Sequence, residues 1–211
     1  HSTSRRQRQM CIRDSLNELL ISEEWVSERK TRWGVESPTY VSKVLAKFPD
    51  ITDDTLLTPA MLLKAQATDL SHIRDIGRLG VDVARFGTDK TCIYWNRGGC
   101  IRLAHIVEKV DTTRTSGEVI KRTKPHNGRL PAVIDAVGVG AGVYDNCREA
   151  RQPVIEFSSG AKAHDPKRFI NRKAELYWEF REMCEKGEID LPEDGEDDDL
   201  LAQLGSIKWF L

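Results

Sequence analysis

Short apolar segments separated by turn residues dominate the middle of the chain. Residues 80–84 and 91–95 each predict a strand, and residues 100–107 largely alternate between apolar and polar side chains, as expected of a third. The turn sequence NRGG at 96–99 separates the second segment from the third. We therefore expect three antiparallel strands joined by short turns.

From residue 115 onward, helix and strand signals alternate. Residues 115–124 predict a helix, and 131–137 are almost continuously apolar, which is typical of a central strand covered on both faces. The glycine-rich segment 138–142 leads into another helix. Residues 153–157 predict the next strand, and 171–186 carry apolar side chains at helical spacing. This order implies a βαβ unit followed by an amphipathic helix.

Residues 16–75 show irregular helical signals. Ser22, Ser37 and Thr58 each precede a short segment of helical character, and residues of these types commonly cap helix N-termini. We therefore expect a linker of short helices. Residues 1–15 contain four arginines and no apolar periodicity, and we expect them to be non-native or disordered.

The character of the sequence changes at residue 76, and we expect a domain over residues 76–211. The chain starts with His1 in place of a methionine and stops at Leu211, inside an apolar segment. We therefore interpret it as a fragment of a longer protein, with a domain that is truncated at its C-terminal end.

The net charge of −1 conceals a segregation of acids from bases. Residues 188–199 hold eight acids and no base, so the other 199 residues carry 32 bases against 25 acids. An anionic partner would therefore meet a basic surface. A hydrophobic content of 39% excludes a largely disordered chain, and no apolar stretch is long enough for a membrane span. The five cysteines are widely spaced without a C-x-x-C pair, so they indicate neither a zinc site nor a disulfide framework.

Two carboxylates interrupt apolar strands, Asp82 in the first and Asp135 in the fourth. A buried charge is costly unless it is paired or coordinated. Either acid could simply cap the turn after its strand. In a mixed sheet of order 3-2-1-4-5, however, the two strands are neighbours and the carboxylates can converge. Converging hard oxygen ligands suit a pair of Mg²⁺ or Mn²⁺ ions, which can activate water for phosphodiester hydrolysis.

Four segments in order carry a family resemblance. They are GVESPTYVSKVLAKFPD, GVDVARFGTDKT, VIDAVGVGAGVYD and NRKAELYWEFREMCEKGEIDLPED, the last standing before LLAQL. Together they resemble the nuclease domain of the tailed-phage terminase large subunit, over residues 16 to 211. The resemblance implies an α/β, ribonuclease H-like fold, with a mixed sheet of order 3-2-1-4-5 flanked by helices and a helical linker from the end of the ATPase domain. It also implies an endonuclease that cuts double-stranded concatemeric DNA.

The resemblance assigns roles to individual acids. Asp82 and Asp135 match the family's first and second catalytic, metal-binding residues. Asp89 matches a further acid close to the metals, although it could equally be a turn residue that pairs with Lys90. The family's third catalytic acid lies on a helix beyond the last strand, and nothing here matches it. We interpret the acids at 197–199 as part of a solvated loop, and we expect an incomplete site and an inactive fragment.

The glycines at 138, 140 and 142 could indicate a dinucleotide site. The sequence does not match the G-x-G-x-x-G motif, because Val143 stands where the last glycine of the motif belongs. The chain also contains no P-loop motif. We expect these glycines to let a helix start close to the sheet, with its N-terminal N–H groups facing a phosphate near Asp135. The missing P-loop implies that the ATPase domain lies upstream.

Two groups of basic residues are candidate phosphate contacts, although each residue could also belong to a solvated surface. We favour the first group for DNA binding, because it follows a strand whose end should lie near the metals: Lys162, Lys167, Arg168, Arg172 and Lys173. The second group precedes the fourth strand: Lys121, Arg122, Lys124 and Arg129. Such contacts would not depend on DNA sequence. We interpret His105, His126 and His164 as structural or surface residues.

The resemblance also implies partners and a location. The partners are double-stranded DNA, the terminase ATPase domain of the same full-length chain, the portal and the small terminase subunit, with no membrane, in the host cytoplasm. Two other functions stay open. An actin-like or sugar-kinase-like phosphotransferase also presents an Asp beside Gly and Thr after its first strand, and it would bind ATP. A non-catalytic docking module of the packaging motor would bind motor partners without taking up metal.

Overall fold

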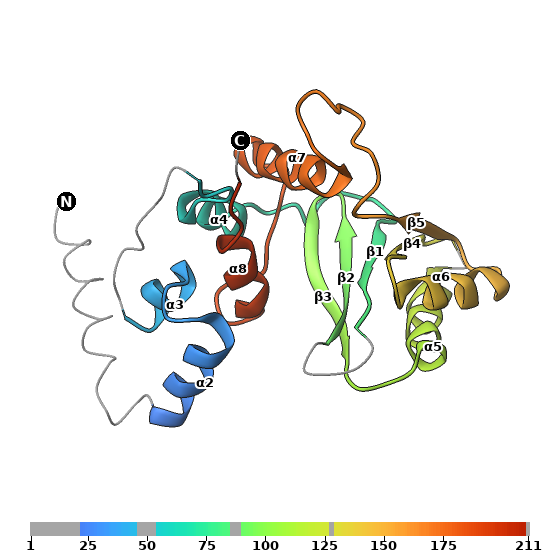
Figure 1. Cartoon of the computed structure of the whole chain (residues 1–211), viewed down its shortest axis with the longest axis horizontal. Coiled ribbons are helices and arrows are strands. Elements are labelled where there is room, and N and C mark those ends of the chain that lie inside the picture. The colour runs from blue at the N-terminus through green and yellow to red at the C-terminus, as the bar shows by residue number, and fades with distance from the viewer. Residues whose placement is uncertain (1–21, 46–53, 85–89, 127–128, 210–211) are drawn as a thin grey trace. The chain divides into compact units, whose positions relative to one another are not determined.

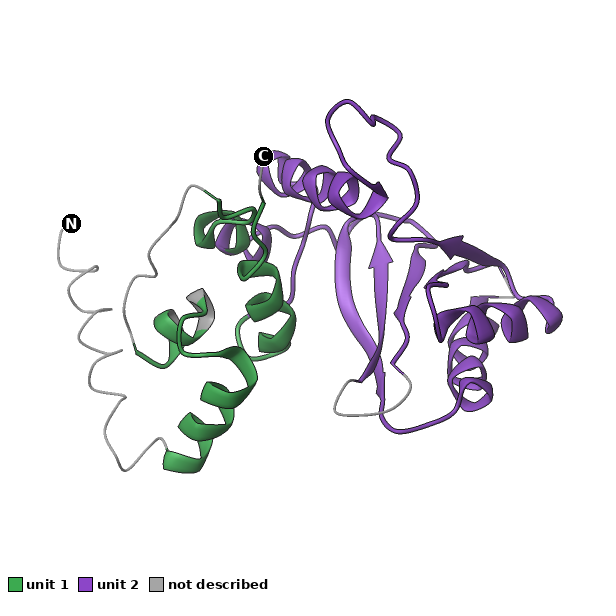
Figure 2. Ribbon diagram, viewed as in Figure 1, with its two compact units in different colours: residues 1–62, 194–211 green, residues 63–193 purple. Residues whose placement is uncertain are grey.

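The chain divides into two units in a computed structural model that describes residues 22–45, 54–84, 90–126 and 129–209 (Figure 1). One unit comprises residues 1–62 and 194–211, and the other comprises residues 63–193 (Figure 2). The domain boundary that we predict at residue 76 stays a prediction.

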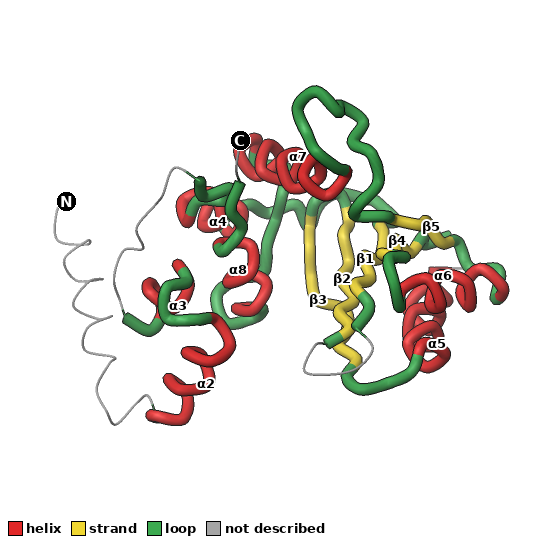
Figure 3. Tube along the Cα trace, in the orientation of Figure 1, coloured by secondary structure: helices red, strands yellow, loops and turns green. Residues whose placement is uncertain are grey.

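A five-stranded mixed sheet forms the centre of the second unit (Figure 3). Its strands are β1 (Arg78–Asp82), β2 (Thr91–Arg97), β3 (Cys100–Val107), β4 (Ala132–Asp135) and β5 (Val154–Phe157). The strand order is β3-β2-β1-β4-β5, which confirms the predicted order. Strands β1, β2 and β3 pair antiparallel, whereas β4 is parallel to both β1 and β5.

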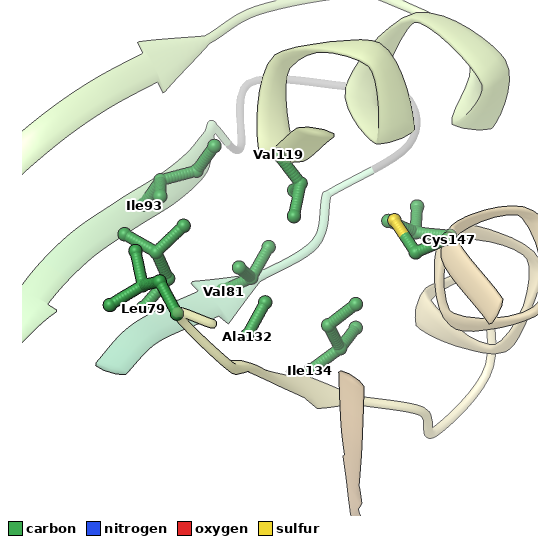
Figure 4. Packing of buried hydrophobic residues seen from close by; sticks show 9 residues of the cluster. Leu79, Val81, Ile93, Val119, Ala132, Ile134 and Cys147 are labelled. Carbon is green, nitrogen blue, oxygen red and sulfur yellow. The ribbon is translucent and has the colours of Figure 1, made fainter. Parts of the chain in front are cut away.

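The alternation of side chains along the strands builds a hydrophobic core on one face of the sheet. Leu79 and Val81 of β1 are buried, and so are Ala132 and Ile134 of β4. Two helices, α5 (Thr112–Thr123) and α6 (Gly140–Glu149), add Val119, Val143 and Cys147 to the same cluster (Figure 4). Full burial of one such aliphatic side chain stabilises the fold by about 1.5–3 kcal/mol. The face with these residues is therefore the one that holds the domain together.

The turn between β2 and β3 forms where glycines are needed. Gly98 and Gly99 both have positive φ, at 59° and 96°, which suits a two-residue hairpin turn and is costly for other residues. The NRGG sequence therefore marks the hairpin correctly, with Arg97 as the last residue of β2.

The amphipathic helix α7 (Arg172–Lys186) follows β5 and has clear local stop signals. Asn171 caps its start by accepting a hydrogen bond from the backbone N–H of Ala174 at 2.9 Å, and Gly187 ends it in the left-handed conformation with φ of 77°. None of the helices in the described part of the chain is long and apolar enough to cross a membrane.

The first unit contains the short helices expected near the N-terminus. They are α2 (Glu23–Trp33) and α3 (Pro38–Lys43), together with the start of α4 (Pro59–Gln66), which continues into the second unit. Ser22 and Ser37 cap α2 and α3 by accepting hydrogen bonds from backbone N–H groups three residues on. Gly34 is the C-cap of α2.

The acids at 197–199 do not form the solvated loop that the sequence suggests. They start a further helix, α8 (Asp198–Gly205), for which Asp197 is the N-cap. Asp198 lies 2.5 Å from the Lys43 ammonium, and Asp199 pairs with Arg32. Negative charge stabilises the first turn of a helix, because the N–H groups there carry partial positive charge. These acids therefore have structural roles within the first unit.

Asp197→Ala is expected to destabilise the chain by about 1 kcal/mol, because the side chain accepts a hydrogen bond from the Leu200 N–H at 3.1 Å. Urea unfolding measures this loss. Gln203→Ala is the matched control, since Gln203 is an exposed residue of the same helix. A loss no greater than that of the control would contradict the capping role.

Candidate functional site

Asp82 and Asp135 are the last residues of two neighbouring parallel strands, β1 and β4. The register pairs Val81 with Ile134, so the two acids are the next residues along their strands. Neighbouring strands lie about 4.8 Å apart. Because side chains alternate along a strand and Val81 and Ile134 face the core, both carboxylates belong to the opposite face of the sheet.

The two carboxylates differ in their surroundings. Asp82 is exposed, whereas Asp135 is half-buried. Asp135 also caps the turn after its strand, because its Oδ1 accepts a hydrogen bond from the Val137 N–H at 3.2 Å. The turn role and a role as an oxygen ligand are compatible, since a carboxylate offers about four lone-pair positions.

The helix α6 starts directly against Asp135. A Cβ atom on Gly140, the first residue of this helix, would lie 1.7 Å from the carbonyl oxygen of Asp135. Only glycine permits such a close approach. The N-cap residue Val139 makes no side-chain capping hydrogen bond to the first turn. The structure thus bears out the expectation that a glycine lets the helix start close to the sheet beside Asp135.

The candidate metal site consists of two acids in the part of the chain that the structure describes. Asp89 lies outside the described residues. Within residues 22–45, 54–84, 90–126 and 129–209, no group of three or more His, Cys, Asp or Glu side chains is placed to hold a metal ion. Asp82 and Asp135 are therefore the oxygen donors that the fold brings side by side here.

A basic loop at residues 158–171 follows β5, the strand next to the one that ends at Asp135, and leads to α7 (Figure 1). Phe157, the last residue of β5, is the register partner of Asp135. The two ends of the loop are fastened together, because the Lys173 N–H donates to the Ser159 carbonyl at 3.1 Å and the Arg172 N–H donates to the Ala161 carbonyl at 2.8 Å. The start of α7 is thereby held close to the edge of the sheet where Asp135 lies.

Glu175, a buried acid of α7, holds the loop from inside. Its carboxylate accepts hydrogen bonds from the backbone N–H groups of His164 and Asp165, both at 2.8 Å, and from the Arg172 guanidinium at 2.6 Å. Burial acts to raise the pKa of Glu175, but these three donors outweigh it and lower the pKa to about 2. The carboxylate is therefore charged at neutral pH and acts as the anchor of the basic loop.

Sequence reasoning missed Glu175. The available signal was an acid within the apolar stretch Ala174–Tyr177 of an amphipathic helix, one turn after the Asn171 cap. Two of the three groups that bind its carboxylate lie 10 and 11 residues earlier, in a loop without periodicity, so the sequence does not reveal them.

The five predicted DNA-binding residues divide into two kinds. Arg172 lies in ion pairs with Glu175 at 2.6 Å and Glu179 at 3.2 Å, so its guanidinium contributes to the loop anchor. The other four are exposed, although Arg168 also lies 4.0 Å from the Glu182 carboxylate: Lys162, Lys167, Arg168 and Lys173. These four remain the candidate phosphate contacts, and they belong to a loop that leaves the same edge of the sheet as the two acids.

The second basic group lies elsewhere. Arg129 stands shortly before the first residue of β4, at the amino end of the strand whose carboxyl end carries Asp135. Arg122 pairs with Glu118 on α5 at 2.6 Å. Lys121 and Lys124 are exposed near the end of that helix. This arrangement favours the first group as the one near the acids.

The fold matches those of nuclease domains from two phages. The nuclease domain of the large terminase subunit of bacterial virus Sf6 superposes with a TM-score of 0.60 at 17% identity, over 74% of this chain and 84% of that one. A variant of that domain with manganese and β-thujaplicinol gives 0.62 at 15% identity with the same coverage.

The large terminase nuclease of thermophilic phage G20c, with bound magnesium, gives a TM-score of 0.56 at 13% identity, over 76% of this chain and 84% of that one. Neither a family model nor a curated protein matches the chain. The structural likenesses establish that the chain has the ribonuclease H-like fold of these domains, as the sequence resemblance implies.

Proposed function

We propose that this chain is the nuclease domain of a phage DNA-packaging terminase, a metal-dependent endonuclease that cuts double-stranded DNA. One observation carries the proposal: Asp82 and Asp135 end neighbouring parallel strands and belong to the same face of the sheet. The likeness to the Sf6 and G20c terminase nucleases adds support, because the folds of those domains superpose on this one.

The two carboxylates fit a divalent cation by their chemistry. Both are hard oxygen donors, and oxygen donors of this kind suit Mg²⁺ and Mn²⁺. The related domains have been observed with manganese and with magnesium. When bound, a pair of such ions would supply an activated water and neutralise charge on the scissile phosphate. Asp82 and Asp135 would hold the ions, and Asp89 is proposed as a further acid close to them.

The remaining residues of the proposed site bind and orient the DNA backbone. Lys162, Lys167, Arg168 and Lys173 are proposed to contact phosphates, with Arg172 positioning the loop through Glu175. The first turn of α6, which starts against Asp135, is proposed to offer backbone N–H groups to a phosphate. Contacts of this kind act on the backbone without reading bases, which suits cleavage wherever packaging stops.

The likeness to large terminase subunits also supports the proposed setting. We place the domain downstream of a terminase ATPase domain in the same full-length chain, acting with the portal and the small terminase subunit. The host cytoplasm is the proposed location. The exposed basic loop provides the surface for double-stranded DNA.

Asp82→Asn and Asp135→Asn are each expected to reduce Mn²⁺-dependent nicking of supercoiled plasmid at least about 100-fold, because each removes a charged oxygen donor. The measurement uses the full-length protein that contains this chain. Electron paramagnetic resonance of Mn²⁺ gives an independent readout, in which each variant should bind the ion more weakly.

The matched control is Glu156→Gln on β5. Glu156 is an exposed carboxylate one strand away, but its register partner is Ile134, so it belongs to the face opposite to the two acids. This variant should nick at the parent rate. Undiminished nicking by Asp82→Asn would contradict the proposal, and measurable ATP binding by this chain would favour a phosphotransferase instead.

A further inference from the structure

Ile170 is the most exposed large apolar residue in the described part of the chain, with 91% of its surface accessible, against 62% for Leu63, the next. It stands immediately before Asn171, the N-cap of α7. A hydrophobic residue at this position commonly packs against the fourth residue of the helix. Here the fourth residue is Glu175, which is occupied as the loop anchor, so Ile170 lacks the usual apolar partner.

The backbone on both sides of Ile170 is held in place. Phe169 contacts Trp178 of α7, with 6.3 Å between the ring centroids. On the other side, Asn171 caps the helix through the Ala174 N–H. The Ile170 side chain therefore projects from a supported position.

The surroundings of Ile170 are strongly basic. Residues 158–173 contain five bases and one acid. Lys167, Arg168 and Lys173 are exposed within three residues of Ile170, and the Arg168 guanidinium lies over the Phe169 ring at 5.0 Å. A single apolar side chain among cationic ones matches duplex DNA, where phosphates flank apolar base faces.

We propose that Ile170 is an apolar wedge that enters the minor groove and partly unstacks one base step of the DNA. Lys167, Arg168 and Lys173 hold the phosphates beside that step. The inference rests on the proposed function for the identity of the ligand, and it extends that function by assigning a deformed DNA conformation to the bound state. Wedges of this kind bend DNA and allow more protein surface to contact it.

Strand pairing and a backbone hydrogen bond connect the segment that carries Ile170 to the candidate metal site. Phe157 pairs with Asp135, and two residues later the Ser159 carbonyl accepts the Lys173 N–H. Ile170 lies three residues before Lys173. Unstacking of a base step by Ile170 would therefore make the duplex easier to deform close to the phosphate at the proposed metal site of Asp82 and Asp135.

The test measures the fluorescence of a duplex that carries 2-aminopurine, which brightens when its neighbours unstack, in EDTA so that no cleavage occurs. The 211-residue chain should brighten the probe. Ile170→Ala should abolish the signal and weaken binding about tenfold, because burial of an isoleucine is lost. Ile170→Phe should retain both. Leu63→Ala is the control, since Leu63 is also exposed but lies on α4.

The outcomes separate the wedge from the nuclease activity. Unchanged fluorescence and affinity in Ile170→Ala would overturn the wedge, even if the full-length protein still nicks plasmid. An Ile170-dependent signal would support the wedge even if Asp82→Asn nicked normally, a result that would contradict the nuclease assignment alone. If Ile170→Ala instead changed only the sedimentation of the free chain, Ile170 would serve an interface between copies and the wedge would be wrong.

Discussion

Gly140→Ala is expected to destabilise the chain by about 3 kcal/mol or more and to displace Asp135, because overpacking against backbone cannot be relieved by a side-chain rotation. The added Cβ would lie 1.7 Å from the Asp135 carbonyl oxygen and 2.9 Å from its carbonyl carbon. Either α6 or the end of β4 must move. Urea unfolding measures the loss of stability, and Mn²⁺ binding reports the displacement of the carboxylate.

Gly117→Ala is the matched control for this substitution. Gly117 lies inside α5, and apart from its chain neighbours and the nearby backbone of its own helix no atom of the described residues lies within 4 Å of the position that its Cβ would take. Alanine is the better helix former by about 1 kcal/mol, so this variant should gain stability. A Gly140→Ala chain as stable as the parent would show that α6 does not start against the sheet as the structure has it.

Glu175→Ala is expected to release the basic loop. The substitution removes the acceptor for the His164 and Asp165 N–H groups and the partner of Arg172. Trypsin should then cleave after Lys162, Lys167 or Arg168 at least about tenfold faster, because proteolysis follows the population of the open loop. Binding of duplex DNA should weaken as well, since the basic side chains of the loop would no longer be held in one arrangement.

Glu179→Ala is the control for the loop. Glu179 also pairs with Arg172, at 3.2 Å, but it is exposed and accepts no backbone hydrogen bond from the loop in the contacts described. This variant should remain as resistant to trypsin as the parent. If trypsin cleaved both variants equally fast, and faster than the parent, the Arg172 ion pairs rather than the hydrogen bonds to the Glu175 carboxylate would hold the loop.

The same anchor predicts a dependence on pH. The pKa of Glu175 falls from an ordinary value of 4.5 to about 2 in the folded chain. A lowered pKa means that the carboxylate stabilises the fold fully above about pH 4.5 and loses this contribution as the pH falls toward 2. The amide proton of His164 should titrate in nuclear magnetic resonance spectra with a midpoint near 2. A midpoint near 4.5 would show that the carboxylate is not held.

Local patterns predicted most of the fold. Apolar alternation located the strands, and Ser22 and Ser37 mark helix starts that the structure confirms. These features depend on residues within one turn or one strand, so they can be read along the chain. The interpretation of the acids at 197–199 as a solvated loop was wrong, because their partners Arg32 and Lys43 stand about 160 residues earlier in the chain.

The sequence by itself determined which residues could carry the chemistry: an Asp at the end of each of two apolar strands, glycines before a helix and a basic loop. Only the tertiary structure decided that Asp82 and Asp135 share a register and a face, that Gly140 touches the Asp135 backbone and that Glu175 anchors the loop. The physical reason is that strand pairing and buried hydrogen bonds join residues far apart in the chain, and their geometry follows from packing rather than from local periodicity.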